Sequence, residues 1–214
     1  FRGLVAKYEN RLTDAIAAFT TSLNLNQKRH DSAIELAALK CHRFDFKDAY
    51  QLISDCTGDF SKSPVYLNMA GECLVTLGLP DKALPYFERA QHLQPEITEF
   101  TMNLASCLSF VGRSLQATEL LEGLLKAGKG ASSRVLYMLS GLDPQRLEPF
   151  FNEPMTSTQS AEQSVGWGMM LHAKARLCEV NGDMDHAWSL YEQAGEALNS
   201  AAPEAPSSEV KLLN

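Results

Sequence analysis

Small residues recur every 34 positions along this chain, and this repeat restricts the possible folds more than any other feature. Two helices cross closely only where neither carries a bulky side chain, and a large residue forced into such a crossing costs about 1–3 kcal/mol. The ladders therefore predict repeated close crossings of helices. An ordinary helical domain with coincidental alanines is the alternative. Three ladders share the period: the alanines Ala15, Ala49, Ala83 and Ala117, the apolar residues Phe19, Ile53, Phe87 and Leu121, and the small residues Gly3, Ala37, Gly71 and Ala105.

The segment 64–97 shows what one repeat contains. Gly78, Leu79 and Pro80 divide it into two halves, and Pro95 ends the second half. Apolar residues fall on one helical face in each half: Leu67, Ala70, Gly71 and Leu74 in the first, Ala83, Phe87 and Ala90 in the second. The pattern resembles the tetratricopeptide repeat (TPR). This resemblance implies an all-α fold, a right-handed superhelical solenoid of antiparallel helix pairs.

The same frame predicts the domain organisation. We expect one solenoid over residues 1–199, followed by a mobile tail over 200–214 that is rich in Ala, Pro, Ser and Glu. The frame places Phe1 partway through a first helix, so the chain is expected to be a fragment of a longer protein. The repeats are a truncated one over 1–29, full ones over 30–63, 64–97 and 98–131, a degenerate one over 132–167, and a last one over 168–199.

Helix boundaries follow from capping residues. Thr13 is predicted to cap a helix that runs to about Asn24, and Asp31 or Ser32 to cap the first helix of the second repeat. In the turn of that repeat, Phe44 stands where the pattern has glycine.

The degenerate repeat has its own signals. Asp143 before Pro144 predicts a helix start, and Phe150 and Phe151 argue against full exposure, although a flexible linker is the alternative. Ser160 is predicted to begin a long helix that ends near residue 180.

The bulk composition excludes several partners. The net charge is -7 and the isoelectric point about 5.3, which argues against a binder of nucleic-acid phosphates and against docking on an anionic membrane. The sequence has no apolar run long enough for membrane insertion. The five cysteines lack CxxC spacing, so they indicate buried thiols in a reducing, cytoplasmic compartment: Cys41, Cys56, Cys73, Cys107 and Cys178.

No pattern predicts catalysis or a cofactor. The stretch with Gly123, Gly128 and Lys129 is close to a phosphate-binding loop, but it follows a helical segment and lacks the hydroxyl residue after the lysine. Asp183 and His186 lie together at a turn, where a metal site or, alternatively, solvated turn residues with a helix cap would explain them. We therefore expect a chain that is not itself an enzyme.

The candidate functional surface is the concave groove that the TPR resemblance implies. In that family the first helices line a groove that binds proteins or peptides, and methionines suit such adaptable surfaces. Alternatively, these positions are only the less buried side of a scaffold. Carried onto this chain, the groove positions are Ile34, Ala38, Cys41, His42, Asn68, Met69, Glu72, Thr76, Met102, Asn103, Ser106 and Phe110.

One TPR subtype is excluded by the groove residues. TPR domains that hold the carboxylates of a chaperone tail place lysine and asparagine where this chain has Asn68 and Glu72. A carboxylate held beside Glu72 would meet like charge. The predicted partner is therefore a protein or peptide of another kind.

Two further expectations concern what lies next to this chain. Residues 172–198 are similar to the repeat that precedes the catalytic domain in bacterial TPR-linked sulfotransferases, through Ala173-Lys174, Gly182-Asp183 and Ala187-Trp188. The alternative function is therefore the helical arm of a larger enzyme whose catalytic domain is elsewhere. A first helix cut short also exposes an apolar repeat face, which predicts a possible homodimer.

Overall fold

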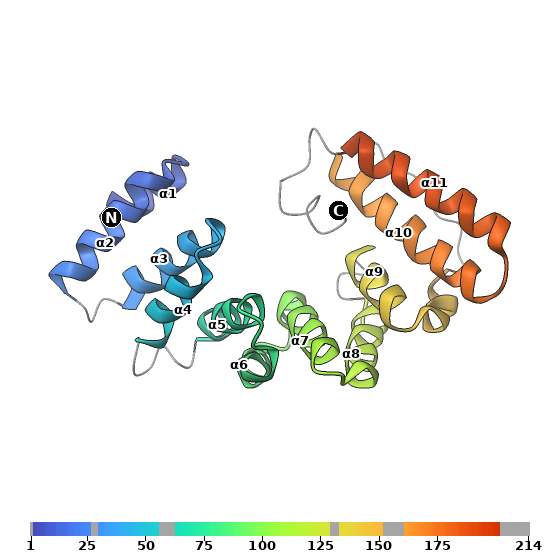
Figure 1. Cartoon of the computed structure of the whole chain (residues 1–214), viewed down its shortest axis with the longest axis horizontal. Helices are drawn as coiled ribbons and strands as arrows, with labels where there is room; N and C mark the ends of the chain where they lie inside the picture. The colour runs from blue at the N-terminus through green and yellow to red at the C-terminus, as the bar shows by residue number, and fades with distance from the viewer. Residues whose placement is uncertain (1, 27–29, 56–62, 129–132, 152–160, 202–214) are drawn as a thin grey trace. The chain divides into compact units, whose positions relative to one another are not determined.

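The computed structural model describes residues 2–26, 30–55, 63–128, 133–151 and 161–201. Every regular element in these ranges is a helix (Figure 1), which confirms the predicted all-α fold built from helical repeats. The chain divides into two compact units, Phe1–Val111 and Gly112–Asn214. The boundary falls in the turn of the fourth predicted repeat, between the helix that ends at Phe110 and the helix that begins at Ser114.

The first unit consists of helices that pack with their neighbours in sequence. Within this unit each helix contacts the next one along the chain, and the first helix α5 also contacts the first helices α3 and α7. This arrangement is expected when each pair buries its apolar face against the next pair. The described helices are α1 (Arg2–Tyr8), α2 (Leu12–Leu25), α3 (His30–His42), α4 (Phe46–Ser54), α5 (Pro64–Thr76), α6 (Pro80–Leu93) and α7 (Thr98–Phe110).

The turns within the repeats share one backbone conformation. The second residue after the end of the first helix has a positive φ at Asn10 (57°), Phe44 (64°), Gly78 (76°) and Gly112 (79°), and these positions are 34 residues apart. At Gly78 the following amide, Leu79 N, donates to Leu74 O at 2.9 Å, which is the Schellman arrangement that ends a helix in the left-handed region. Phe44 therefore occupies the glycine position of the pattern, as predicted, although side chains other than Gly, Asn and Asp rarely adopt this conformation.

The small-residue ladder marks the helix crossings. Ala15, Ala49 and Ala83 are fully buried in the first unit, and Ala117 is fully buried in the second. These alanines leave no room for a larger side chain without a shift of the surrounding residues.

The glycines of the first helices are matched to phenylalanines of the second helices. A Cβ atom added at Gly3 would lie 2.8 Å from the ring of Phe19, and one added at Gly71 would lie 2.7 Å from the ring of Phe87. In the repeat between them the two positions hold alanine and isoleucine, Ala37 and Ile53, which share one core cluster. The crossing thus keeps a similar summed volume, with glycine opposite phenylalanine and alanine opposite an aliphatic residue.

Two predicted helix caps are wrong. Helix α2 begins at Leu12, so Thr13 lies inside it, and α3 begins at His30, so Asp31 and Ser32 lie inside that helix. The Ser32 side chain instead makes a contact between helices, since its hydroxyl forms a 2.9 Å hydrogen bond with the Ser22 hydroxyl of α2. Local capping propensity predicted the helices correctly and their first residues incorrectly.

The second unit contains α8 (Ser114–Lys126), α9 (Ser133–Leu142), the 3-10 helix η2 (Pro144–Phe150), α10 (Ala161–Val180) and α11 (Met184–Ala201) within the described residues. Helix α10 packs along α11 and also against α9 and η2. It ends at Val180, as predicted, whereas the cap expected at Ser160 lies outside the described residues. The tail beyond residue 201 lies outside them as well.

The degenerate repeat is a helix followed by a 3-10 turn. Leu147 of η2 is fully buried, and Phe150 and Phe151 are half-buried, as predicted. Asp143 precedes Pro144, but its carboxylate does not cap the backbone and instead accepts a 3.2 Å hydrogen bond from Arg146 Nε. Arg146 also reaches Glu122 of α8 at 2.8 Å. The Arg146–Glu122 ion pair therefore links this segment to α8.

Candidate functional site

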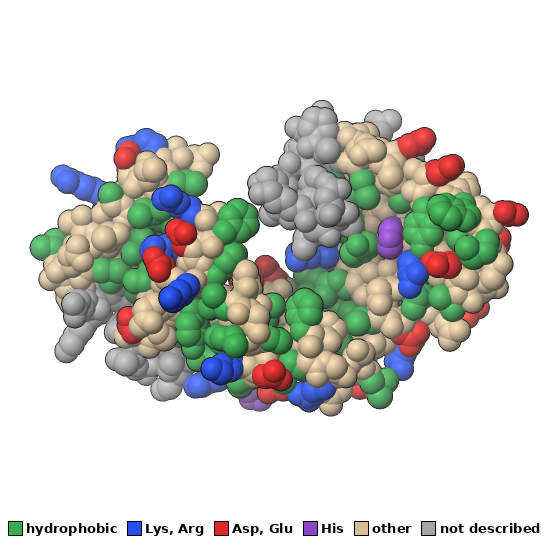
Figure 2. All heavy atoms as spheres, in the orientation of Figure 1, with side chains coloured by type: hydrophobic (Ala, Val, Ile, Leu, Met, Phe, Trp, Pro, Cys, Tyr) green, Lys and Arg blue, Asp and Glu red, His purple; other side chains and the backbone are tan. Residues whose placement is uncertain are grey.

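The predicted groove residues come from three helices that lie next to one another in the first unit. They occupy α3, α5 and α7, the first helices of the second, third and fourth repeats. Figure 2 shows hydrophobic side chains among separate acidic and basic ones over this part of the chain. The three helices therefore carry both apolar and polar side chains at the predicted groove positions.

A hydrogen-bonded polar cluster connects α5 to α7 at the middle of this surface. Asn68 Nδ2 donates to Glu72 Oε1 at 2.9 Å, and Asn103 Nδ2 donates to Glu72 Oε1 at 2.8 Å and to Asn68 Oδ1 at 3.0 Å. Asn68 is buried, with 7% of its surface exposed, whereas Glu72 and Asn103 are half-buried. The two amides orient the Glu72 carboxylate, so the charge has a fixed position on the surface.

The apolar groove residues differ in exposure. Phe110, at the end of α7, has 61% of its surface exposed, while Met102 has only 8% exposed. Met69 and Ile34 are half-buried and pack against the core cluster between α3 and α5. Phe110 and Met69 are therefore more exposed than Met102, which is buried.

The remaining predicted groove residues lie on the same three helices. Ala38 and Ser106 are half-buried, and His42 and Thr76 are exposed. The Thr76 hydroxyl donates to the backbone carbonyl of Glu72 at 2.9 Å, so it is satisfied within its own helix. These residues shape the surface without adding a charge to it.

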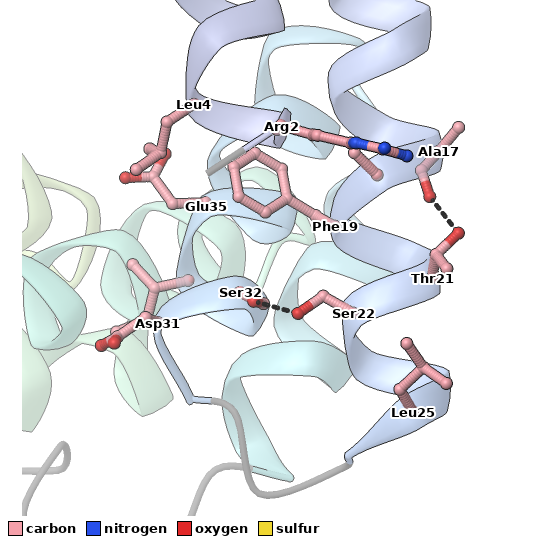
Figure 3. A pocket seen from close by; sticks show the side chains of 13 residues that line it. Arg2, Leu4, Ala17, Phe19, Thr21, Ser22, Leu25, Asp31, Ser32 and Glu35 are labelled. Carbon is pink, nitrogen blue, oxygen red and sulfur yellow. Dashed lines mark hydrogen bonds between the residues drawn. The ribbon is translucent and has the colours of Figure 1, made fainter.

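Sequence reasoning missed a pocket at the other end of the first unit. It has a volume of about 860 Å³ and lies among α1, α2 and α3 (Figure 3). Its apolar lining includes the Phe19, Leu4 and Leu25 side chains. The hydrogen-bonded hydroxyls of Ser22 and Ser32 contribute polar lining. Leu25 has 83% of its surface exposed. The homodimer expected there stays a prediction.

A second polar cluster that the sequence did not reveal lies in the second unit. His172 of α10 stands between the rings of Tyr137 and Tyr191, at centroid distances of 5.0 and 5.3 Å. Glu179 accepts hydrogen bonds from the Tyr191 hydroxyl at 2.8 Å and from Arg176 at 2.7 Å. Burial lowers the pKa of His172, nearby Arg176 lowers it further, and Glu179 opposes both. The burial of His172 and the nearby Arg176 therefore favour the neutral form of its imidazole.

The turn that carries Asp183 and His186 is a helix cap. The His186 backbone amide donates to Asp183 Oδ1 at 3.3 Å, so Asp183 caps the start of α11. Across the described ranges, no group of three or more His, Cys, Asp or Glu side chains has an arrangement that would hold a metal ion. The glycine near the phosphate-loop-like stretch, Gly128, has a φ of 62° and follows the end of α8, as expected of a helix C-terminus.

No helix in the part of the chain that the structure describes has the length and apolar character needed to cross a bilayer.

Only the comparison of structures finds proteins similar to this chain. No family model and no curated protein matches this sequence. Among solved structures, PilF of Pseudomonas aeruginosa matches with a TM-score of 0.63 at 19% identity, over 98% of this chain and 92% of that one. YrrB, a TPR protein with an unusual peptide-binding site, matches with a TM-score of 0.60 at 17% identity, over 89% and 88%. MamA matches with a TM-score of 0.54 at 15% identity, over 94% and 96%.

These similarities, which cover nearly the whole of each chain, agree with the 34-residue ladders, the shared turns and the paired helices. The similar structures do not test the expected similarity of residues 172–198 to the repeat that precedes the catalytic domain of sulfotransferases, and this similarity stays a prediction. The chain has the fold of the tetratricopeptide-repeat proteins.

Proposed function

We propose that the surface formed by α3, α5 and α7 binds a peptide segment of a partner protein, and that this segment places a lysine or arginine between apolar residues. The observation that carries the proposal is the Glu72 carboxylate, which Asn68 and Asn103 hold at the middle of the surface. A fixed, half-buried carboxylate favours a cationic side chain and disfavours an anionic one.

The charges around Glu72 support a basic partner. Helices α3, α5 and α7 also carry the carboxylates Asp31, Glu35 and Glu99. Lys40 of α3 is bound to Asp48 of α4 at 2.7 Å, and Glu35 is bound to Lys7 of α1 at 2.6 Å. Counted over the three helices, four carboxylates, including Glu72, stand against the single lysine Lys40, so these helices have an excess of negative charge, in agreement with the net charge of -7 of the whole chain.

The apolar contacts come from Met69 and Phe110. Met69 lies on α5 with Glu72, and the exposed Phe110 lies at the end of the neighbouring helix α7. A flexible methionine adapts to more than one apolar shape. Binding of an extended segment or a short helix along stacked first helices uses such alternating anchors. The expected affinity is micromolar or weaker, because one fixed charge and two apolar anchors supply few strong contacts.

The test uses a library of acetylated and amidated peptides in which one central position is Lys, Arg, Gln or Glu and its neighbours are apolar. Binding is measured by fluorescence anisotropy with the full chain. We expect the Lys and Arg peptides to bind and the Glu peptides not to bind. Glu72→Gln should weaken the binding of the Lys peptides roughly 10-fold and leave the Gln peptides unchanged.

Two further variants locate the surface. The double variant Met69→Glu with Phe110→Glu should abolish binding of every peptide, whereas Glu96→Gln, which removes an exposed carboxylate from the loop before α7, should have no effect. Equal binding to the wild type and to the double variant would show that the ligand sits elsewhere. Equal binding of Lys and Glu peptides would refute the role of Glu72.

A further inference from the structure

Two thiols from neighbouring repeats lie close together in the first unit, where helix α3 contacts helix α5. Cys41 Sγ of α3 lies 3.3 Å from Cys73 Sγ of α5, and both cysteines are free. Cys73 is completely buried, whereas Cys41 is half-buried and so accessible from one side. The distance is close to van der Waals contact, and a small side-chain movement brings the sulfur atoms to the disulfide length of about 2.0 Å.

The repeat explains why this pair stands apart. Cys107 occupies the position one repeat after Cys73, but its thiol points to the carbonyl of Pro80 at 3.3 Å. The position one repeat after Cys41 is Val75, so Cys107 of α7 has no thiol at the corresponding position of α5. The repeat therefore provides a matched control, a cysteine in the same frame with no thiol across from it.

The two thiols have different acidity. The hydrogen bond from Cys73 lowers the pKa of Cys41, while burial and the charge of Glu72 act against this. The same hydrogen bond and burial raise the pKa of Cys73. Because the thiolate is the nucleophile in disulfide exchange, the more accessible Cys41 is also the one that reacts first.

We propose that Cys41 and Cys73 are a reactive dithiol, which a small disulfide such as oxidised glutathione converts to an intramolecular disulfide that joins α3 to α5. The Cys41 thiolate attacks one sulfur of oxidised glutathione, and one glutathione thiolate leaves. The Cys73 sulfur then attacks Cys41 Sγ and expels the second glutathione thiolate. The two cysteines lose two protons and two electrons, and the oxidant becomes two molecules of reduced glutathione, which take up both protons.

The disulfide would link α3 to α5, which are two of the three helices of the proposed peptide-binding surface. It closes the chain from Cys41 to Cys73 into a loop and so restricts the unfolded state. Oxidation should therefore raise the thermal midpoint of the first unit by roughly 5–10 °C, and dithiothreitol should reverse the rise. The proposal does not depend on peptide binding.

The experiment treats the full chain with oxidised glutathione, quenches it with acid and measures intact mass and linked peptides. We expect a product that has lost two hydrogen atoms and contains a Cys41–Cys73 peptide. Cys107→Ser should form the same product. Cys73→Ala, chosen because the site is buried and apolar, should stop at one attached glutathione on Cys41, and Cys41→Ser should leave Cys73 unmodified.

Other outcomes overturn the proposal. A wild-type chain that accumulates separate glutathione adducts on Cys41 and Cys73, or that links either one to Cys56, would show that the two thiols do not form the preferred pair. A wild-type chain that keeps one glutathione on Cys41, as Cys73→Ala is expected to, would show that Cys73 does not reach Cys41, and a wild-type chain that stays fully reduced would show that Cys41 does not react with a small disulfide. The readout on the unmutated protein keeps the test valid if a variant folds poorly.

Discussion

Replacing Gly71 with alanine tests the match between glycine and phenylalanine at the helix crossings. The added methyl carbon would lie 2.7 Å from the ring of Phe87, and Phe87 has only 2% of its surface exposed. The ring is enclosed by the core and has little room to move, so the helices must separate or the ring must leave its preferred rotamer. We expect the substitution to destabilise the first unit.

The magnitude follows from two opposing effects. Alanine is favoured over glycine inside a helix by about 1 kcal/mol, whereas overpacking of a filled core costs about 1–3 kcal/mol. Gly123 supplies the matched control, because it lies inside α8 with no atom within 4 Å of an added Cβ. Gly123→Ala should therefore stabilise the chain, and the two substitutions should differ by about 1–3 kcal/mol in their effect on the free energy of unfolding.

A second substitution should relieve the clash. Phe87→Ile, combined with Gly71→Ala, reproduces the Ala37 and Ile53 combination of the preceding repeat. Each single variant is expected to be destabilised, one by overpacking and the other by a gap. The double variant should be more stable than the sum of the two losses by about 1–2 kcal/mol, since the residues are in contact.

The assay is equilibrium unfolding in urea with two probes. Far-ultraviolet circular dichroism reports all helices, whereas tryptophan fluorescence reports the second unit, because both tryptophans, Trp167 and Trp188, lie there. Gly71→Ala should change mainly the dichroism. The reasoning is refuted if Gly71→Ala unfolds at the same or a higher urea concentration than Gly123→Ala, or if the double variant shows no coupling.

Three other perturbations follow from the structure. Ala83→Leu should cost about 1–3 kcal/mol, since Ala83 is fully buried, and an unchanged melting temperature would contradict this. Phe44→Gly should stabilise the chain by about 0.5–1 kcal/mol in urea unfolding, because Phe44 has a positive φ, whereas Asn10→Gly should have a smaller effect. The pKa of His172 is lowered in the folded chain, so the unfolded chain binds more protons, and the tryptophan-detected stability should fall as the pH drops below about 6.5. His172→Phe should weaken this pH dependence.

Two features of the candidate site, its hydrogen bonds between helices and the burial of its side chains, could not be predicted from the sequence. The repeat frame placed Asn68, Glu72 and Asn103 on neighbouring helices, but their mutual hydrogen bonds join side chains 31 and 35 positions apart. Met102 was expected as an accessible anchor, but only 8% of its surface is exposed. A repeat pattern fixes the helical face on which a residue lies, whereas depth on that face depends on the side chains of adjacent helices.

The sequence by itself determined the helix pairs, the crossings and the turns. These depend on local features that recur every 34 residues, namely small residues at close approaches and left-handed turn positions such as Gly78 and Gly112. Only the tertiary structure decided that Cys41 meets Cys73, that His172 lies between two tyrosines, and that Ser32 bonds to Ser22 rather than capping its helix. The physical reason is that such contacts join side chains from different helices, and their distances are set by packing rather than by any pattern along the chain.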